Sequence, residues 1–212
     1  MTIAVKATFG LVPEGPARMI APEEIVARDR HHEGNPASSV EAAGELAPYL
    51  PKVGVILVGH AYAPGGQPAP SVSAHLSIFR ERALLDKTVH VFGDRGGGSP
   101  APFQRMPLRY ERAFGGPGDA ENPVGTGALP GTPLPNLIDP GDPQRRAGFG
   151  PIAASWPSRS GLLDAEARAH LGGRVQDLGA GFPFGYFQPA PPDQQLEALE
   201  GDEWLILDGL HP

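Results

Sequence analysis

Glycine and proline interrupt this chain so often that they restrict it to short regular elements joined by many turns. The 212 residues include 29 glycines and 26 prolines, about a quarter of the chain and close to the share found in disordered sequences. These residues cluster, however, between stretches of alternating apolar residues such as Val53 to Ala63 and Val89 to Phe92, as turn residues do in loop-rich β proteins. The sequence therefore predicts a mainly β fold, an antiparallel β-sandwich or open barrel with long ordered loops and one short helix.

Six stretches have the composition or the period-2 alternation of strands. The first, Ile3 to Phe9, is predicted to be a core strand because its odd-numbered residues are all apolar. Pro64-Gly-Gly66 predicts a tight reversal that joins the second and third strands as a hairpin, and the spacing of the next strands indicates a meander. The other five stretches are Val53 to Tyr62, Val72 to Phe79, Lys87 to Phe92, Leu108 to Phe114 and Glu203 to Leu207.

Helical signals are few. Leu162 to Leu171 has apolar residues at helical spacing and is predicted as the short helix, and Ser39 to Glu45 is compatible with one helical turn after a serine cap. Region 96–160 is expected to be a long ordered loop, because apolar anchors from Phe103 to Trp156 recur along it. Residues 1–212 are expected to form a single domain.

Charge and composition exclude several classes of function. The net charge is −7 and the isoelectric point is near 5.4, without a lysine or arginine run that would neutralise nucleic acid. No apolar stretch approaches the 18 residues of a membrane span, and nothing resembles a signal peptide. The chain has no cysteine. We therefore expect a cytoplasmic protein that binds neither nucleic acid nor membrane.

No catalytic, cofactor or metal motif is recognisable. The seven histidines lack the spacing of zinc ligands, no serine lies in a GxSxG or SxxK motif, and the glycine runs lack the lysine of a phosphate-binding loop. A carbohydrate-active hydrolase that pairs Asp94 with His60 or Glu111 remains an alternative, as does a glycan-binding module that uses Trp156 or Trp204. The two tryptophans are more simply explained as core residues, His60 and His90 as structural histidines, and Asp94 as a turn cap.

The segment 102–116 is the densest group of arginine and aromatic residues, the types enriched at binding hot spots. Two interpretations stay open. The arginines and Glu111 form a buried network that braces the long loop, or the segment is an exposed strip that contacts a partner. The tentative partner-binding residues are Arg105, Arg109, Tyr110, Arg112 and Phe114. Acidic residues without lysine or arginine fill the stretch from Pro189 to the end, so the surface charge is expected to be polarised.

Nine short motifs, in order along nearly the whole chain, resemble the DUF2169 family. The structural residues in or beside them are His60, Tyr62, Asp94, Arg95, Glu111, Asn122 and Trp156. The motifs are 5–9 (VKATF), 59–66 (GHAYAPGG), 91–95 (VFGDR), the 102–116 segment, 122–125 (NPVG), 134–137 (LPNL), 148–152 (GFGPI), 156–159 (WPSR) and 187–194 (FQPAPPDQ).

The resemblance implies a non-enzymatic cytoplasmic adaptor or chaperone of the type VI secretion system. Such a protein binds an effector protein and promotes its loading onto the VgrG spike, often with a PAAR protein. The chain departs from the family pattern in two ways: it begins and ends close to family motifs, so terminal parts of the family domain are expected to be lacking, and Gly96 to Gly98 replaces bulkier residues.

Overall fold

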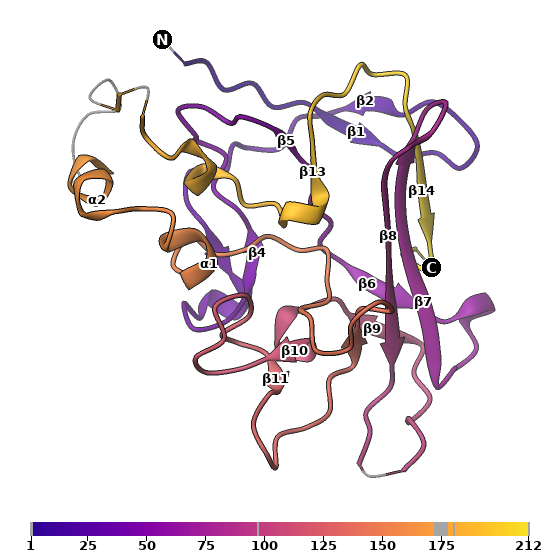
Figure 1. The fold of residues 1–212 in the computed structure, drawn as a ribbon. Helices are drawn as coiled ribbons and strands as arrows, with labels where there is room; N and C mark the ends of the chain where they lie inside the picture. The colour runs from indigo at the N-terminus through magenta and orange to yellow at the C-terminus, as the bar shows by residue number, and fades with distance from the viewer. Residues whose placement is uncertain (1, 97, 172–177, 180, 212) are drawn as a thin grey trace.

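A computed structural model describes residues 2–96, 98–171, 178–179 and 181–211 and confirms a mainly β protein (Figure 1). Within these residues the strands form one four-stranded sheet and five two-stranded sheets. The strands are β1 (Thr8–Gly10), β2 (Arg18–Ile20), β3 (Arg30–His31), β4 (Val40–Ala42), β5 (Val53–Gly54), β6 (His60–Tyr62), β7 (Ser71–Phe79), β8 (Ala83–Phe92), β9 (Arg105–Pro107), β10 (Phe114–Gly115), β11 (Thr126–Gly127), β12 (Leu137–Ile138), β13 (Gln195–Leu196) and β14 (Trp204–Asp208), and the helices are α1 (Pro157–Ser160) and α2 (Ala165–Leu171).

The four-stranded sheet has the order β12-β8-β7-β14, and all of its pairs are antiparallel. The long hairpin β7–β8 forms its centre, and β14 lies along the far side of β7 (Figure 1). Alternation along β7 places Ala74, Leu76 and Ile78 on one face, and all three are buried. The strands predicted at 72–79, 87–92 and 203–207 are therefore confirmed.

The predicted hairpin at Pro64-Gly-Gly66 is wrong. The stretch from Val53 to Tyr62 is divided into β5 and β6, and β6 pairs with β9, so that Ala61 lies opposite Met106. Pro64–Gly66 forms a single 3-10 turn with Gly65 and Gly66 at positive φ. That turn leads the chain into β7 without pairing β6 to it in one sheet.

The N-terminal segment is not a core strand, contrary to prediction. Only Thr8–Gly10 is a strand, and its partner is the exposed β2. Ile3 and Val5 are 71% and 87% exposed. Their alternation describes an apolar face, but in the described chain no other layer covers that face.

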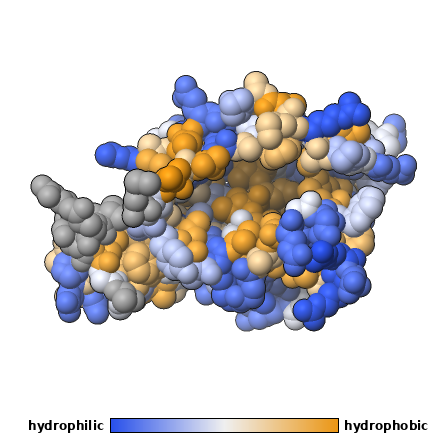
Figure 2. All heavy atoms as spheres, turned by 90° about the horizontal axis from the view of Figure 1, so that it is seen from above, coloured by the Kyte–Doolittle hydropathy of each residue, from blue (hydrophilic) through white to orange (hydrophobic). Residues whose placement is uncertain are grey.

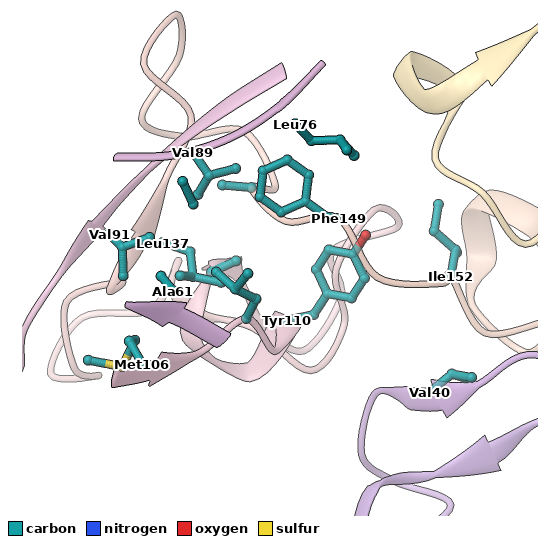
Figure 3. Close-up of a cluster of buried hydrophobic side chains, with 14 of the residues drawn as sticks. Val40, Ala61, Leu76, Val89, Val91, Met106, Tyr110, Leu137, Phe149 and Ile152 are labelled. Atoms are coloured by element: carbon teal, nitrogen blue, oxygen red, sulfur yellow. The ribbon is translucent and has the colours of Figure 1, made fainter. Parts of the chain in front are cut away.

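The main core lies between the inner face of the four-stranded sheet and the loops that follow β8 (Figure 3). Phe149 is fully buried and points toward Leu76 and Val89 of the hairpin. The predicted loop anchors Met106, Leu108, Leu137, Ile152 and Trp156 join the same core, whereas Leu134 is half exposed. Trp156 is thus a core residue as expected, but Trp204 is 61% exposed and is not.

The predicted short helix is confirmed as α2, which begins at Ala165 rather than at Leu162. Asp164 determines this start, because its carboxylate accepts a hydrogen bond from the N–H of Ala167 at 2.8 Å, as an N-cap residue does. Leu163 and Ala167 pack with Phe182 in a second, smaller apolar cluster. α2 lies well away from the four-stranded sheet (Figure 1).

Gln194 joins three parts of the chain beneath the sheet. Its buried amide donates to the carbonyl oxygens of Val55 at 2.7 Å and Phe149 at 2.9 Å, and its Oε1 accepts from Lys87 Nζ at 2.7 Å. The ammonium also pairs with Asp193 at 2.7 Å and lies 5.6 Å from the Phe149 ring centroid. Burial lowers the pKa of Lys87, while the carboxylate of Asp193 opposes that shift.

We expect the substitution Gln194→Leu to lower the free energy of unfolding by about 3 kcal/mol or more. It leaves the buried carbonyl of Val55 without its side-chain donor, at roughly 1–3 kcal/mol. It also removes one hydrogen bond from the Phe149 carbonyl, which keeps the Leu57 N–H, and one from the Lys87 ammonium, which keeps Asp193, at about 1 kcal/mol each. Urea unfolding monitored by circular dichroism measures the change. Gln144→Leu, at an exposed loop position, is the matched control and should change stability by less than about 0.5 kcal/mol. Equal effects of the two substitutions would contradict a central role for Gln194.

Candidate partner-binding site

The strand predicted at 108–114 is wrong. Segment 102–116 is a sequence of short elements. β9 ends at Pro107, a 3-10 turn spans Tyr110–Arg112, and β10 follows at Phe114. The buried amide of Asn122 donates to the carbonyl oxygens of Tyr110 and Phe114, each at 2.9 Å. Because these carbonyls bond to a side chain rather than to a neighbouring strand, the segment bends where alternation alone predicts an extended strand.

Tyr110 is a core residue and not a surface anchor. Its hydroxyl donates to the carbonyl of Gly150 at 2.7 Å, and its ring lies 5.3 Å from that of Trp156. Burial raises the pKa of Tyr110, so the phenol remains a neutral donor. A Cβ at Gly148, which has φ +150°, would come within 2.8 Å of this ring. Tyr110 is 2% exposed, which corrects its prediction as a partner-binding residue.

Arg112, in segment 102–116, connects the motifs 91–95 and 134–137. Its guanidinium donates to Asp94 at 3.1 Å and to the side-chain oxygen of Asn136 at 3.0 Å, and Asn136 in turn donates to Asp94 at 3.0 Å. Arg95, beside Asp94, stacks on Phe92 and contacts the Pro135 carbonyl. Asp94 therefore has a structural role, but through side chains rather than through the backbone cap that was predicted.

Glu111 fixes the neighbouring N-terminal loop to this segment. Its two carboxylate oxygens accept from the backbone N–H and the hydroxyl of Ser39, both at 2.7 Å. Ser39 is 2% exposed and precedes β4, which pairs with β3. The helical turn expected at Ser39 to Glu45 is therefore wrong, because the serine side chain bonds to Glu111 instead of capping a helix.

A groove of about 290 Å³ lies beside these contacts. Arg109 extends along it and pairs with Glu33 at 3.0 Å, and both side chains keep substantial exposure. Arg105 is exposed on β9, whereas Phe114 is half-buried. The lining residues are His32, Glu33, Asn35, Ser38, Pro107, Arg109, Glu111 and Arg112.

The structure thus combines features of both interpretations of 102–116. Glu111 and Arg112 brace the loop, while Arg105 and Arg109 face solvent. Partly exposed guanidinium groups on a rigid support are suited to binding carboxylates or backbone carbonyls of another protein. The charge of the groove is mixed, because Glu33 and Glu111 lie among its arginines.

The surroundings of two histidines near the arginines favour their neutral form. Burial lowers the pKa of His32, and the positive charge of Arg109 lowers it further. Burial, followed by Arg105 and Arg109, also lowers the pKa of His60. His60 lies in β6 and its ring is 6.1 Å from that of Tyr62. No cluster of three or more possible metal ligands occurs in the described ranges.

Several important residues escaped the sequence-based prediction. Gln194 and Arg159 lie in the quoted motifs 187–194 and 156–159, yet no role was predicted for either. Arg159 donates to the carbonyls of Ile152 and Tyr186 at 2.5 and 2.6 Å. The only sequence signal for Gln194 and Arg159 was a polar residue beside proline and aromatic residues. Ser39 was predicted only as a helix cap and Glu33 gave no signal, because their partners are 72 and 76 residues away.

The family model described as "Uncharacterized protein conserved in bacteria (DUF2169)" matches residues 1–212. Comparison with curated proteins and with solved structures gives no match. None of the helices in the described part of the chain has the length and apolar character needed to cross a bilayer.

We expect Glu111→Ala to lower the free energy of unfolding by about 1–3 kcal/mol, because it leaves the buried N–H of Ser39 without an acceptor. Glu111→Gln keeps one acceptor oxygen and should cost less. Urea unfolding gives the magnitude, and amide hydrogen exchange at Ser39 locates it. Glu81→Ala, at an exposed position between β7 and β8, is the control. Unchanged exchange at Ser39 in Glu111→Ala would refute the brace.

Stability should decrease as the pH falls from 7 to 5. The unfolded chain binds protons at His32 and His60 near pH 6.5, whereas the folded chain binds them only at lower pH. Carboxylates with lowered pKa values, such as Asp193, lose their contribution mainly below about pH 5. His32→Gln and His60→Gln should each flatten the profile of unfolding free energy against pH, and exposed His170→Gln should not. An unchanged slope in both variants would contradict the attribution of this pH dependence to His32 and His60.

Proposed function

This chain belongs to the DUF2169 family, and from this premise we propose that it is a cytoplasmic, non-enzymatic adaptor of type VI secretion. In this proposal it binds an effector protein and promotes loading of that effector onto the VgrG spike with its PAAR protein. The resemblance of the nine motifs to the family supplies the biological context. The structure supports the proposal with an ordered segment whose arginine side chains are accessible to a partner.

The observation that carries the proposal is the arrangement of the 102–116 segment. Asn122, Glu111 and Arg112 fix its backbone through bonds to distant segments. Arg109 projects from this support beside a groove, with its side chain 36% exposed. A pre-ordered segment loses less conformational entropy on binding than a free loop does, which favours a recognition role.

The side chains considered for hydrolysis are engaged in separate structural contacts. Asp94 bonds to Arg112 and Asn136, and Glu111 bonds to Ser39. A pair of catalytic carboxyl groups instead faces a shared space across the scissile bond. This arrangement favours binding over a hydrolase that uses Asp94 and Glu111.

The test is co-purification of the chain with the effector encoded beside it, followed by measurement of Kd. Arg105→Glu and Arg109→Glu should each weaken the complex about tenfold or more, because each places a negative charge where a guanidinium meets the partner. Arg82→Glu, an equally large charge reversal at an exposed position near the β7–β8 turn, is the matched control and should leave Kd unchanged.

Two outcomes would count against the proposal in different ways. Failure of the unmodified chain to bind the effector would refute the adaptor function. A stable complex with the same Kd in both arginine variants would place the interface elsewhere. Thermal unfolding of each variant should be recorded, because Arg109→Glu also places a carboxylate next to Glu33.

A further inference from the structure

β14 is an open edge of the four-stranded sheet. All five of its residues pair with β7, from Trp204 opposite Phe79 to Asp208 opposite His75, and β14 ends the strand order. Natural edge strands are usually protected by lysine, proline, a bulge or a covering loop. β14 has the sequence Trp-Leu-Ile-Leu-Asp, which contains no lysine or proline, and its pairing with β7 has no bulge.

Apolar side chains are exposed on both faces of this edge. Trp204 is 61% exposed on the face that carries Phe79. Leu205 is 43% exposed on the opposite face, although its neighbour Ile78 on that face is 8% exposed. The layer that covers the inner face of the sheet therefore stops short of Leu205.

The end of the molecule at the top of Figure 1 is hollowed and apolar. Figure 2 views this end and shows an orange hollow bordered by both apolar and hydrophilic side chains. The N-terminal hairpin at this end adds exposed apolar side chains, with Phe9 at 49%, Met19 at 71% and Ile20 at 52%. Exposed apolar surface of this kind typically marks an interaction site.

Negative charge brackets the edge strand. Glu203 immediately precedes β14 and Asp208 ends it. The carboxylate of Glu203 accepts hydrogen bonds from the backbone N–H groups of Glu200 and Gly201, and that of Asp208 lies 3.8 Å from the Nδ1 of His75. Among the described residues, neither carboxylate forms an ion pair with a lysine or arginine. Nearby carboxylates are already neutralised, because Arg80 pairs with Glu200 at 2.8 Å and Asp202 at 2.7 Å. Asp208 lies five positions after Glu203, about 17 Å along an extended strand.

We infer that β14 is a docking strand for an extended segment of another protein chain. The segment would add to the sheet beside β14, with apolar side chains at its centre and a lysine or arginine near each end, about five residues apart. Main-chain hydrogen bonds to the free edge would supply affinity, and the two carboxylates would select the basic ends. The inference rests on the proposed adaptor function only for the identity of the chain that supplies the segment.

A second copy of this chain is a poorer occupant. Pairing two β14 strands would bring Glu203 and Asp208 of one copy beside the same carboxylates of the other, in a stretch from 189 to 212 without lysine or arginine. Like charges placed together across an interface oppose association. The charge pattern therefore favours a basic partner.

The experiment uses a synthetic, fluorescein-labelled peptide, Ser-Lys-Val-Thr-Val-Thr-Lys-Ser, whose lysines are five residues apart. Fluorescence anisotropy should show saturable binding to the full chain. Leu205→Glu should weaken binding at least about tenfold, whereas Leu129→Glu, the same change at a 49% exposed loop position, should not. A peptide with both lysines replaced by glutamate should also bind at least about tenfold more weakly.

Amide hydrogen exchange provides a readout that does not depend on a variant. Bound peptide should slow exchange at residues 204–208 of the unmodified chain. Absence of saturable binding, unprotected amides in β14, or equal losses in Leu205→Glu and Leu129→Glu would overturn the inference. So would a dimer in analytical ultracentrifugation that Leu205→Glu dissociates, because the edge would then belong to a second copy. Effector co-purification tests the adaptor function separately, so that either idea can fail alone.

Discussion

The buried amide of Gln194 is the interaction on which the rest of the fold most depends. It joins the C-terminal segment to the carbonyls of Val55 and Phe149 and to the ammonium of Lys87. These three groups come from a strand end, a loop and the central hairpin. Phe149 fills the space beneath that hairpin, so fixing its backbone also fixes the main core.

Hydrogen bonds from buried side chains to backbone groups recur through the protein. With short strands and few helical turns, many backbone groups have no partner in a regular ladder, although buried polar groups must be hydrogen-bonded. Side chains supply the missing partners: Asn122 for Tyr110 and Phe114, Arg159 for Ile152 and Tyr186, and Glu111 for Ser39. A chain rich in glycine and proline thereby becomes an ordered support for loops.

This construction is compatible with the proposed adaptor role, because ordered loops can present binding groups at little entropic cost. The two candidate surfaces differ in chemistry. The groove beside Arg109 presents half-exposed guanidinium groups, whereas β14 presents apolar side chains between carboxylates. Two surfaces of different character would allow one adaptor to contact more than one segment of its partners.

The sequence by itself determined the elements that depend on local pattern. Alternation located β7, the composition of short apolar stretches located β8 and β14, and helical spacing located α2, because pleating and helical pitch act on neighbouring residues. The resemblance to the family was likewise legible in short ordered motifs. Among the candidate site residues, Glu111, Asn122 and Trp156 were predicted to be structural and Arg112 to bind a partner, but their contacts within the chain were not predictable.

Only the tertiary structure decided which apolar faces are covered and which polar groups meet. Alternation in Ile3 to Phe9 is as regular as in β7, yet Ile3 and Val5 are exposed while Leu76 is buried, because burial requires a second layer that the pattern does not specify. The segment from Leu108 to Phe114 bends because the amide of Asn122 donates to two of its backbone carbonyls. Tyr110 is buried because Gly148 leaves room for its ring. Contacts between residues far apart in the chain depend on the path of everything between them, which no local spacing encodes.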